Sequence, residues 1–235
     1  GTIECGRNIL AGGNILISGG NITATMLSSY DGDLTISGGT INARQESNDP
    51  TIKGNNVTIT GGKINAYGNS YPAIYSYNDM TINGGIIEAV NIEGSYPYGI
   101  YAMDNLTIGG TAYIDAKGGS EAIRGGGSLS VADTLQMKSG TDSNVHVGDD
   151  TSTHPGHLVN GIDELISLVT IGKDLNGGDV SFNRTTYDFG KVTIGGNVKP
   201  QIVVIENTGS VPLIFKDIGT SIYIVEDLSA DMIRP

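Results

Sequence analysis

The sequence has very few of the bulky residues around which a single globular core is usually built. It contains no tryptophan and only 3 phenylalanines among 235 residues, but 36 glycines. Glycine adopts backbone conformations that other residues avoid, so this composition predicts many tight turns. We therefore expect a repeated architecture that buries apolar residues along an axis rather than around one centre.

Cysteine, long apolar runs and positive charge are also scarce. The single cysteine, Cys5, excludes a disulfide within the chain. No stretch approaches the ~18 consecutive apolar residues of a membrane-spanning helix, so we expect a soluble chain without membrane insertion. Lysine and arginine number 13 against 25 aspartates and glutamates, and the net charge of −12 disfavours nucleic acid and anionic membranes as partners. The first residues do not read as an export signal, and we expect any such signal to have been removed or to lie outside this sequence.

A phrase of eight residues recurs along the first part of the chain. Its clearest copies occupy residues 15–22, 34–41, 57–64 and 80–87, and the second reads Leu-Thr-Ile-Ser-Gly-Gly-Thr-Ile. A degraded fifth copy starts at residue 106, and a sixth, which lacks the glycine pair, starts at residue 129. The starts are 19, 23, 23, 26 and 23 residues apart, a spacing typical of one turn of a β-solenoid.

Within each repeat, apolar and polar residues alternate, which predicts strands with one buried face. We expect three short strands per turn, with the glycine pair bending the chain between the first two. The predicted interior ladders are Ile17, Ile36, Ile59, Ile82, Ile108 and Val131 on the first strand; Ile41, Ile64, Ile87 and Ile114, with Ala43, Ala66, Ala89 and Ala116, on the second; and Ile52, Ile74, Ile100 and Ile123 on the third. A leucine-rich repeat is excluded, since its leucine pattern and helical return are lacking.

The sequence thus predicts an all-β fold, with a right-handed parallel β-helix of about six turns over residues 1–140. Residues 141–177 interrupt the pattern with a polar segment, a short helix near 161–165 and an apolar strand at 166–171. We expect them to form an end-cap and linker, because the last turn would otherwise expose unpaired backbone groups.

The repeats resemble the carbohydrate-binding β-helix domains of surface proteins from clostridia and other gut Firmicutes. The resemblance covers about residues 1–140 and rests on the Ile-x-Gly-Gly-x-Ile-x-Ala turns and on the return strands Ala-Ile-Tyr at 73–75 and Gly-Ile-Tyr at 99–101. It implies a fold similar to that of polysaccharide lyases and a role in polysaccharide binding, often with calcium. It also implies an extracellular location, either secreted or anchored at the cell surface of a gut bacterium.

Residues 178–235 return to short alternating segments. They resemble the small immunoglobulin-like (Ig-like) modules of Firmicutes surface proteins, on the segments Tyr-Asp-Phe-Gly at 187–190 and Glu-Asn-Thr-Gly at 206–209. A sandwich of that class has about seven strands and roughly 100 residues. We therefore expect a partial, truncated immunoglobulin-like β-sandwich here.

Outward positions of the third strand form the first candidate site. The residues after the inward isoleucines are Lys53, Tyr75, Tyr101 and Arg124, one per turn at about 4.8 Å spacing. Tyr71, Tyr96 and Tyr98 lie on the preceding loops. Tyrosine rings stack on the C–H faces of sugars, while Lys and Arg bind hydroxyls or carboxylates. We predict carbohydrate binding by Lys53, Tyr71, Tyr75, Tyr98, Tyr101 and Arg124. Ordinary cross-strand packing of surface tyrosines is the alternative.

A second outward ladder runs through Thr23, Asn42, Asn65, Glu88 and Asp115, with Lys117 close by. Two stacked carboxylates repel unless a cation lies between them, so Glu88 and Asp115 are the candidate calcium ligands. The alternative is a pair of solvated carboxylates that Lys117 partly neutralises.

Two further groups of polar residues have simpler interpretations. The corner residues Asp33, Asn56, Asp79 and Asn105 are expected to cap turns by bonding to the local backbone. His146, His154 and His157 have no recognised zinc spacing, and we expect them on a polar surface loop.

No nucleophile elbow, phosphate loop or metalloprotease motif occurs in the sequence, and we assign no catalytic residues. We expect a non-catalytic, secreted or cell-surface module whose partner is a polysaccharide or host glycan. Two alternatives stay open. One is a calcium-dependent polysaccharide lyase-like enzyme, for which only Glu88, Asp115, Lys117 and Lys138 could be assembled. The other is a structural adhesin or stalk segment.

Overall fold

The computed structural model describes residues 1–4, 6–173 and 175, and, closer to the C-terminus, four short strands. The chain divides into two compact units, Gly1–Lys173 and Asp174–Pro235. Every element in the described residues is a β-strand. None of these residues forms a helix of the length and hydrophobicity needed to cross a bilayer.

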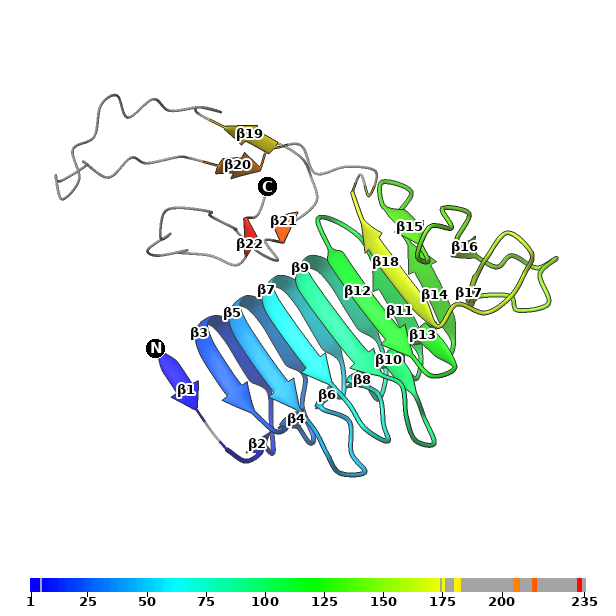
Figure 1. The fold of residues 1–235 in the computed structure, drawn as a ribbon. Helices are drawn as coiled ribbons and strands as arrows, with labels where there is room; N and C mark the ends of the chain where they lie inside the picture. The colour runs from blue at the N-terminus through cyan, green and yellow to red at the C-terminus, as the bar shows by residue number, and fades with distance from the viewer. Residues whose placement is uncertain are drawn as a thin grey trace, which may run out of the picture. The chain divides into compact units, whose positions relative to one another are not determined.

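The first unit is a β-solenoid of about six turns (Figure 1). Its larger sheet begins with the short β1 (Thr2–Glu4) and continues with one long strand per turn, each parallel to the next. The long strands are β3 (Ile15–Ala24), β5 (Leu34–Arg44), β7 (Val57–Tyr67) and β9 (Met80–Asn91). In the fifth turn the same path is divided into β11 (Asn105–Ile108) and β12 (Tyr113–Gly118), and in the sixth β14 (Ser128–Val131) pairs with β11.

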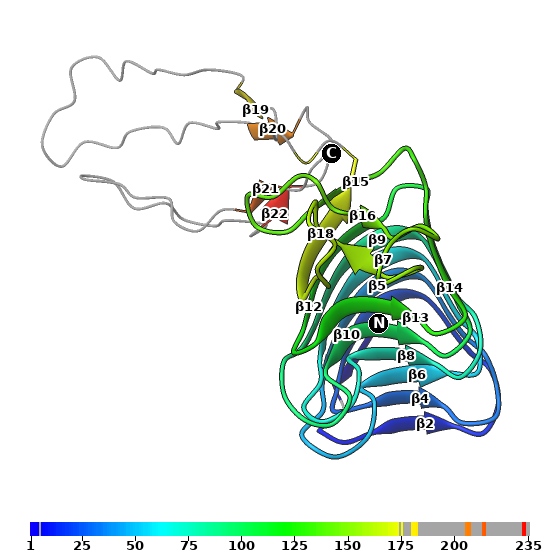
Figure 2. The same ribbon diagram turned by 90° about the vertical axis from the view of Figure 1, so that its right-hand side faces the viewer.

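The smaller sheet contains the return strand of each turn (Figure 2). Its six strands are β2 (Ile9–Ala11), β4 (Leu27–Ser29), β6 (Ile52–Gly54), β8 (Ile74–Ser76), β10 (Tyr98–Ala102) and β13 (Glu121–Gly125). The loops that lead into these strands differ in length from turn to turn, so insertions are placed at one edge of the solenoid.

The glycine pair bends the chain without breaking the strand in the first four turns, so the first two predicted strands are joined there. The second glycine of each pair has a left-handed backbone, with φ between 85° at Gly20 and 94° at Gly62. From the second copy to the fourth, the first glycine has no room for a side chain, since a Cβ on Gly61, for example, would lie 2.6 Å from the carbonyl oxygen of Ser37 in the preceding turn. The pairing register shifts at this bend and then resumes. The fifth turn has the separate strands that the sequence predicts.

The predicted interior ladders are confirmed. Ile36, Ile59, Ile82 and Ile108 are fully buried and follow one another in register, and the isoleucines and alanines of the second strand and the isoleucines of the third are buried as well. Val131, at the end of its ladder, is half-buried and packs against the core. One hydrophobic cluster extends from Ile17 to Ile171, so each turn covers the apolar residues of its neighbours. Burial of an aliphatic side chain contributes about 1.5–3 kcal/mol.

The corner Asx residues bond between turns, so the prediction that they bond to the local backbone is wrong. The side-chain oxygen Oδ1 of Asp33 accepts from the backbone N–H of Asn56 at 3.1 Å and from its Nδ2 at 2.9 Å. Asn56 Oδ1 accepts from the backbone N–H of Asp79 at 3.3 Å, and Asp79 Oδ1 from that of Asn105 at 3.1 Å. Stacking of equivalent corners brings the next turn's N–H within reach, and the result is a hydrogen-bonded ladder along the axis.

The C-terminal part of the first unit covers the last complete turn. β18 (Leu168–Gly172) pairs antiparallel with β12 on one side and with β15 (Gln136–Lys138) on the other. The pair β16 (His146–Val147) and β17 (Leu158–Val159) lies between β15 and β18 in the chain. The helix predicted near residues 161–165 is wrong, since these residues form a turn in which Asn160 Oδ1 accepts from the backbone N–H groups of Ile162 and Glu164.

In the second unit the structure describes two antiparallel pairs. β19 (Val180–Phe182) pairs with β20 (Ile205–Asn207), and β21 (Leu213–Ile214) pairs with β22 (Met232–Ile233). These two pairs do not show an immunoglobulin-like sandwich, and the other residues of the range 178–235 for which it is predicted lie outside the described residues.

Candidate functional site

Six tyrosines gather on the outer side of the smaller sheet and its loops. Their positions follow from strand alternation, since Ile74 and Ile100 point into the core and the next residue of each strand must point outward. Tyr75 and Tyr101 are therefore register neighbours, with ring centroids 5.7 Å apart. Tyr77 packs against Tyr75 and Tyr98 against Tyr101, while Tyr71 and Tyr96 contact each other on the loops. We call the six residues the tyrosine face: Tyr71, Tyr75, Tyr77, Tyr96, Tyr98 and Tyr101.

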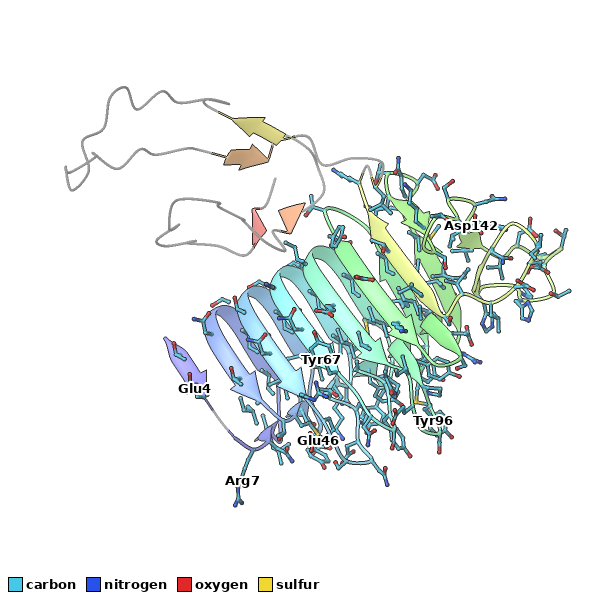
Figure 3. The ribbon with its side chains drawn as sticks, viewed as in Figure 1. Glu4, Arg7, Glu46, Tyr67, Tyr96 and Asp142 are labelled. Carbon is cyan, nitrogen blue, oxygen red and sulfur yellow. The ribbon has the colours of Figure 1, made fainter. Side chains whose placement is uncertain are left out.

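The rings of the tyrosine face form an irregular surface, with one group of four contacting rings and one pair. Tyr75 and Tyr101 meet at 62° rather than lying coplanar, and Tyr77 packs edge-on against Tyr75 at 4.9 Å. The flattest pair is Tyr71 and Tyr96, on loops of successive turns, with centroids 5.3 Å apart and planes tilted by only 32°. Tyr96, which is labelled in Figure 3, is also the most exposed of the six, at 49%. The part of the surface best shaped for a flat ligand therefore lies on the loops.

The phenol of Tyr75 is partly buried and is influenced by four neighbouring tyrosines. Partial burial, followed by the influence of the neighbouring Tyr77, Tyr101, Tyr71 and Tyr96, raises the pKa of its phenol to about 12. A neutral phenol that is packed against other rings offers its edge and hydroxyl rather than a charge. This packing supports both contact with a ligand and the cross-strand packing alternative.

Lys53 differs from the prediction, because it is not available to a ligand. It is in register with Tyr75 as predicted, yet only 2% of the residue is exposed. Its Nζ donates to Asp49 Oδ1 at 3.0 Å and lies 4.9 Å from the centre of the Tyr30 ring. Burial of an ammonium group is tolerable because both the carboxylate and the ring compensate its charge.

Arg124 lies at the other end of the outward row that Lys53, Tyr75 and Tyr101 begin. Its guanidinium lies over the rings of Tyr98 and Tyr101, at 5.6 and 5.9 Å from their centres. One nitrogen, Nη1, donates to the Tyr98 hydroxyl at 3.1 Å and to Glu121 Oε1 at 3.2 Å. The other oxygen of Glu121 lies 2.7 Å from Nδ1 of His157. Both predicted cations of the site are thus already neutralised by carboxylates of the protein.

The second outward ladder is in register as predicted, with Glu88 beside Asp115. Asp115 stays exposed, yet partial burial raises the pKa of its carboxyl and the charge of Glu88 raises it further. The hydroxyl of Tyr67 is hydrogen-bonded to Glu88, and partial burial together with this bond raises the pKa of Tyr67 to about 12. Calcium takes 6 to 8 oxygen ligands, and the described residues contain no group of three or more His, Cys, Asp or Glu placed to hold a metal. Two carboxylates supply too few ligands for calcium, and we propose no function that depends on this ion.

The three histidines lie on the C-terminal part of the first unit. His146 is exposed on β16, and Nδ1 of His154 lies 3.1 Å from the carbonyl oxygen of Asp163. The rings of His154 and His157 are 6.4 Å apart. Only His157 contacts the candidate site, through Glu121, and the sequence spacing alone did not predict this contact.

Two tyrosines of this region were not predicted. Tyr77 lies two positions after Tyr75 and so continues the outward side of the strand, a signal that alternation could have provided. Tyr30 lies after β4 and reaches Lys53 from the preceding turn. Its role depends on the path of the loop and leaves no clear pattern in the sequence.

No protein-family model, curated protein or solved structure matches this chain. The resemblance to carbohydrate-binding β-helix domains therefore stays a prediction from the repeats themselves.

Proposed function

We propose that this chain is a non-catalytic polysaccharide-binding protein, secreted or held at the cell surface, which binds neutral glycan chains on the tyrosine face. The observation that carries the proposal is the gathering of six tyrosines from successive turns on one side of the solenoid. Tyr96 and Tyr77 are 49% and 42% exposed, and exposed aromatic clusters on an otherwise polar surface commonly mark binding sites.

The charge distribution supports a neutral ligand. Lys53 is paired with Asp49 and Arg124 with Glu121, so neither offers an unpaired charge to a uronate. The whole chain has a net charge of −12, which repels polyanions at long range. Neutral sugar rings can still stack their C–H faces on Tyr71 and Tyr96 and bond to tyrosine hydroxyls.

Affinity electrophoresis of the full chain tests this proposal. Native gels containing β-glucan, xylan, galactomannan or polygalacturonate are run with calcium and with a chelator. We expect retardation by at least one neutral polysaccharide, little by polygalacturonate, and no effect of the chelator. Migration unaffected by every polysaccharide would contradict the proposal and favour the adhesin or stalk alternative. Calcium-dependent release of unsaturated, ultraviolet-absorbing products from polygalacturonate would instead support a lyase.

A further inference from the structure

A groove of about 460 Å³ lies where β5, β7 and β9 end and the chain leaves the larger sheet. Its volume is in the range of small-ligand sites. Arg44, Tyr67 and Val90 line it from three successive turns and are neighbours in register, so the groove runs along the solenoid axis. Figure 3 shows Glu46 and Tyr67 at this edge of the molecule. The groove has no lining residue in common with the tyrosine face.

The walls of the groove are held by hydrogen bonds between successive loops. The backbone N–H of Gln45 donates to the carbonyl of Tyr67 at 2.9 Å, and that of Gly68 to the carbonyl of Val90 at 2.8 Å. Asn69 Nδ2 donates to the carbonyl of Glu46 at 3.2 Å. The buried side chain of Gln45 accepts from the N–H groups of Glu46 and Ser47, at 3.1 and 3.4 Å. The lining side chains therefore project from a fixed backbone.

The lining combines an apolar floor with planar polar groups. Tyr67, Val90 and the half-exposed Ile92 supply apolar surface, and the Arg44 guanidinium lies 5.7 Å from the centre of the Tyr67 ring. Exposed carboxylates of Glu46 and Glu93 flank this surface. A pyranose ring has the matching chemistry, because its C–H face packs on apolar side chains while its hydroxyls bond to carboxylates and guanidinium groups.

We propose that this groove is a second saccharide site, which takes a neutral oligosaccharide lying along the solenoid axis. Two carboxylates against one guanidinium leave the groove with a negative charge, and Glu88, hydrogen-bonded to Tyr67, adds to it. A uronate chain is therefore disfavoured. The proposal requires no binding at the tyrosine face, although both sites would select the same class of ligand.

Methyl NMR of the full chain, labelled at isoleucine and valine, tests the proposal. The probes are cellohexaose, xylohexaose and mannohexaose, with trigalacturonate as the acidic comparison. We expect at least one neutral probe to shift the methyl signals of Ile92 and Val90 saturably, with trigalacturonate leaving them in place. If none of the three neutral probes moves these signals, the groove is not a saccharide site. Equal shifts with trigalacturonate would overturn the assignment of a neutral ligand.

Substitutions distinguish binding in the groove from binding at the tyrosine face. Glu93→Gln and Arg44→Met each remove one charged partner from an exposed position, and we expect binding at Ile92 to weaken about tenfold, the effect of one lost charge-assisted hydrogen bond. Lys63→Met, on the same outer side but outside the groove, is the matched control and should have no effect. Tyr75→Ala with Tyr101→Ala should leave the Ile92 shift intact. If that double variant abolishes the shift, the groove does not bind independently. Shifts confined to Ile74 and Ile100, the isoleucines next to Tyr75 and Tyr101, would overturn the groove as a binding site and leave the proposed function standing.

Discussion

Single glycines determine how closely successive turns of the solenoid can stack. A Cβ on Gly61 would meet the Ser37 carbonyl oxygen at 2.6 Å, whereas a Cβ on Gly19, the equivalent residue of the first copy, would meet nothing within 4 Å. We predict that Gly61→Ala lowers the free energy of unfolding by about 1–3 kcal/mol, the usual cost of overpacking. Gly19→Ala should leave it nearly unchanged. Denaturant unfolding of both variants checks this, and equal effects would argue against the stacked arrangement.

The phenol of Tyr75 gives a prediction about pH. Its pKa of about 12 in the folded chain exceeds the ordinary value of 10.0, because burial favours the neutral form. A raised pKa means that the unfolded chain loses this proton first, so the contribution of Tyr75 to stability falls as pH rises from 10.0 toward 12. In an ultraviolet titration of phenolate, Tyr75→Phe should remove a component that titrates near pH 12. Loss of a component near pH 10.0 would show that Tyr75 is solvated like a free tyrosine.

At the scale of elements, the Asx ladder ties the corners of successive turns together. Asp79 Oδ1 accepts from the backbone N–H and Nδ2 of Asn105, at 3.1 and 2.8 Å. Asp79→Ala removes both bonds at a surface position and should cost about 1 kcal/mol. Hydrogen exchange at the Asn105 amide should accelerate, while the adjacent exposed substitution Asn78→Ala should leave it unchanged. An unaltered Asn105 exchange rate in Asp79→Ala would show that the ladder contributes little.

The strands and their register were predictable from the sequence, whereas the contacts made by loops were not. Alternation fixes which side of a strand faces the core, and a slip of one residue would expose every isoleucine of that strand, so Tyr75 and Tyr101 had to be outward neighbours. The same rule placed Lys53 outward, yet it is buried because a loop brings Asp49 and Tyr30 onto it. Loop paths depend on contacts between turns, and no periodic pattern in the sequence encodes them.

The periodic sequence pattern also did not predict the hydrogen-bonding partners of polar residues. The Asx spacing predicted equivalent corners but gave no means to distinguish a bond within one turn from a bond to the next. Likewise, the apolar alternation of residues 166–171 predicted a strand but not that β18 would run antiparallel to β12. The groove beside Tyr67 needs three loops to be positioned together, and no pattern in the sequence predicts that arrangement.

At the scale of the first unit, Glu121 joins the last turns of the solenoid to the segment that covers them. This carboxylate is buried and bonded to Arg124 at 3.2 Å and to His157 at 2.7 Å. Removing one partner of a buried ion pair leaves the others uncompensated, so Glu121→Ala should cost on the order of 3 kcal/mol. Exchange at β17 and β18 should accelerate with it. Glu164→Ala, an exposed carboxylate of the same segment, is the control, and an equal loss from both variants would contradict this role.

At the scale of the whole molecule, glycan binding at the tyrosine face depends on many weak contacts. Each exposed stacking contact contributes on the order of 1 kcal/mol, so a single sugar should bind weakly and a long chain more tightly. Tyr71 and Tyr96 are the best pair to remove, because they lie on loops, outside the strand pairing, and form the flattest part of the surface.

The most direct test compares retention of the wild-type chain and of Tyr71→Ala with Tyr96→Ala on the neutral polysaccharide that retards the wild type most. We predict that the double variant migrates freely at an unchanged melting temperature, while Ile162→Ala, which removes an exposed apolar side chain from the C-terminal part of the first unit, is retained like the wild type. Full retention of the folded double variant would contradict glycan binding at the tyrosine face.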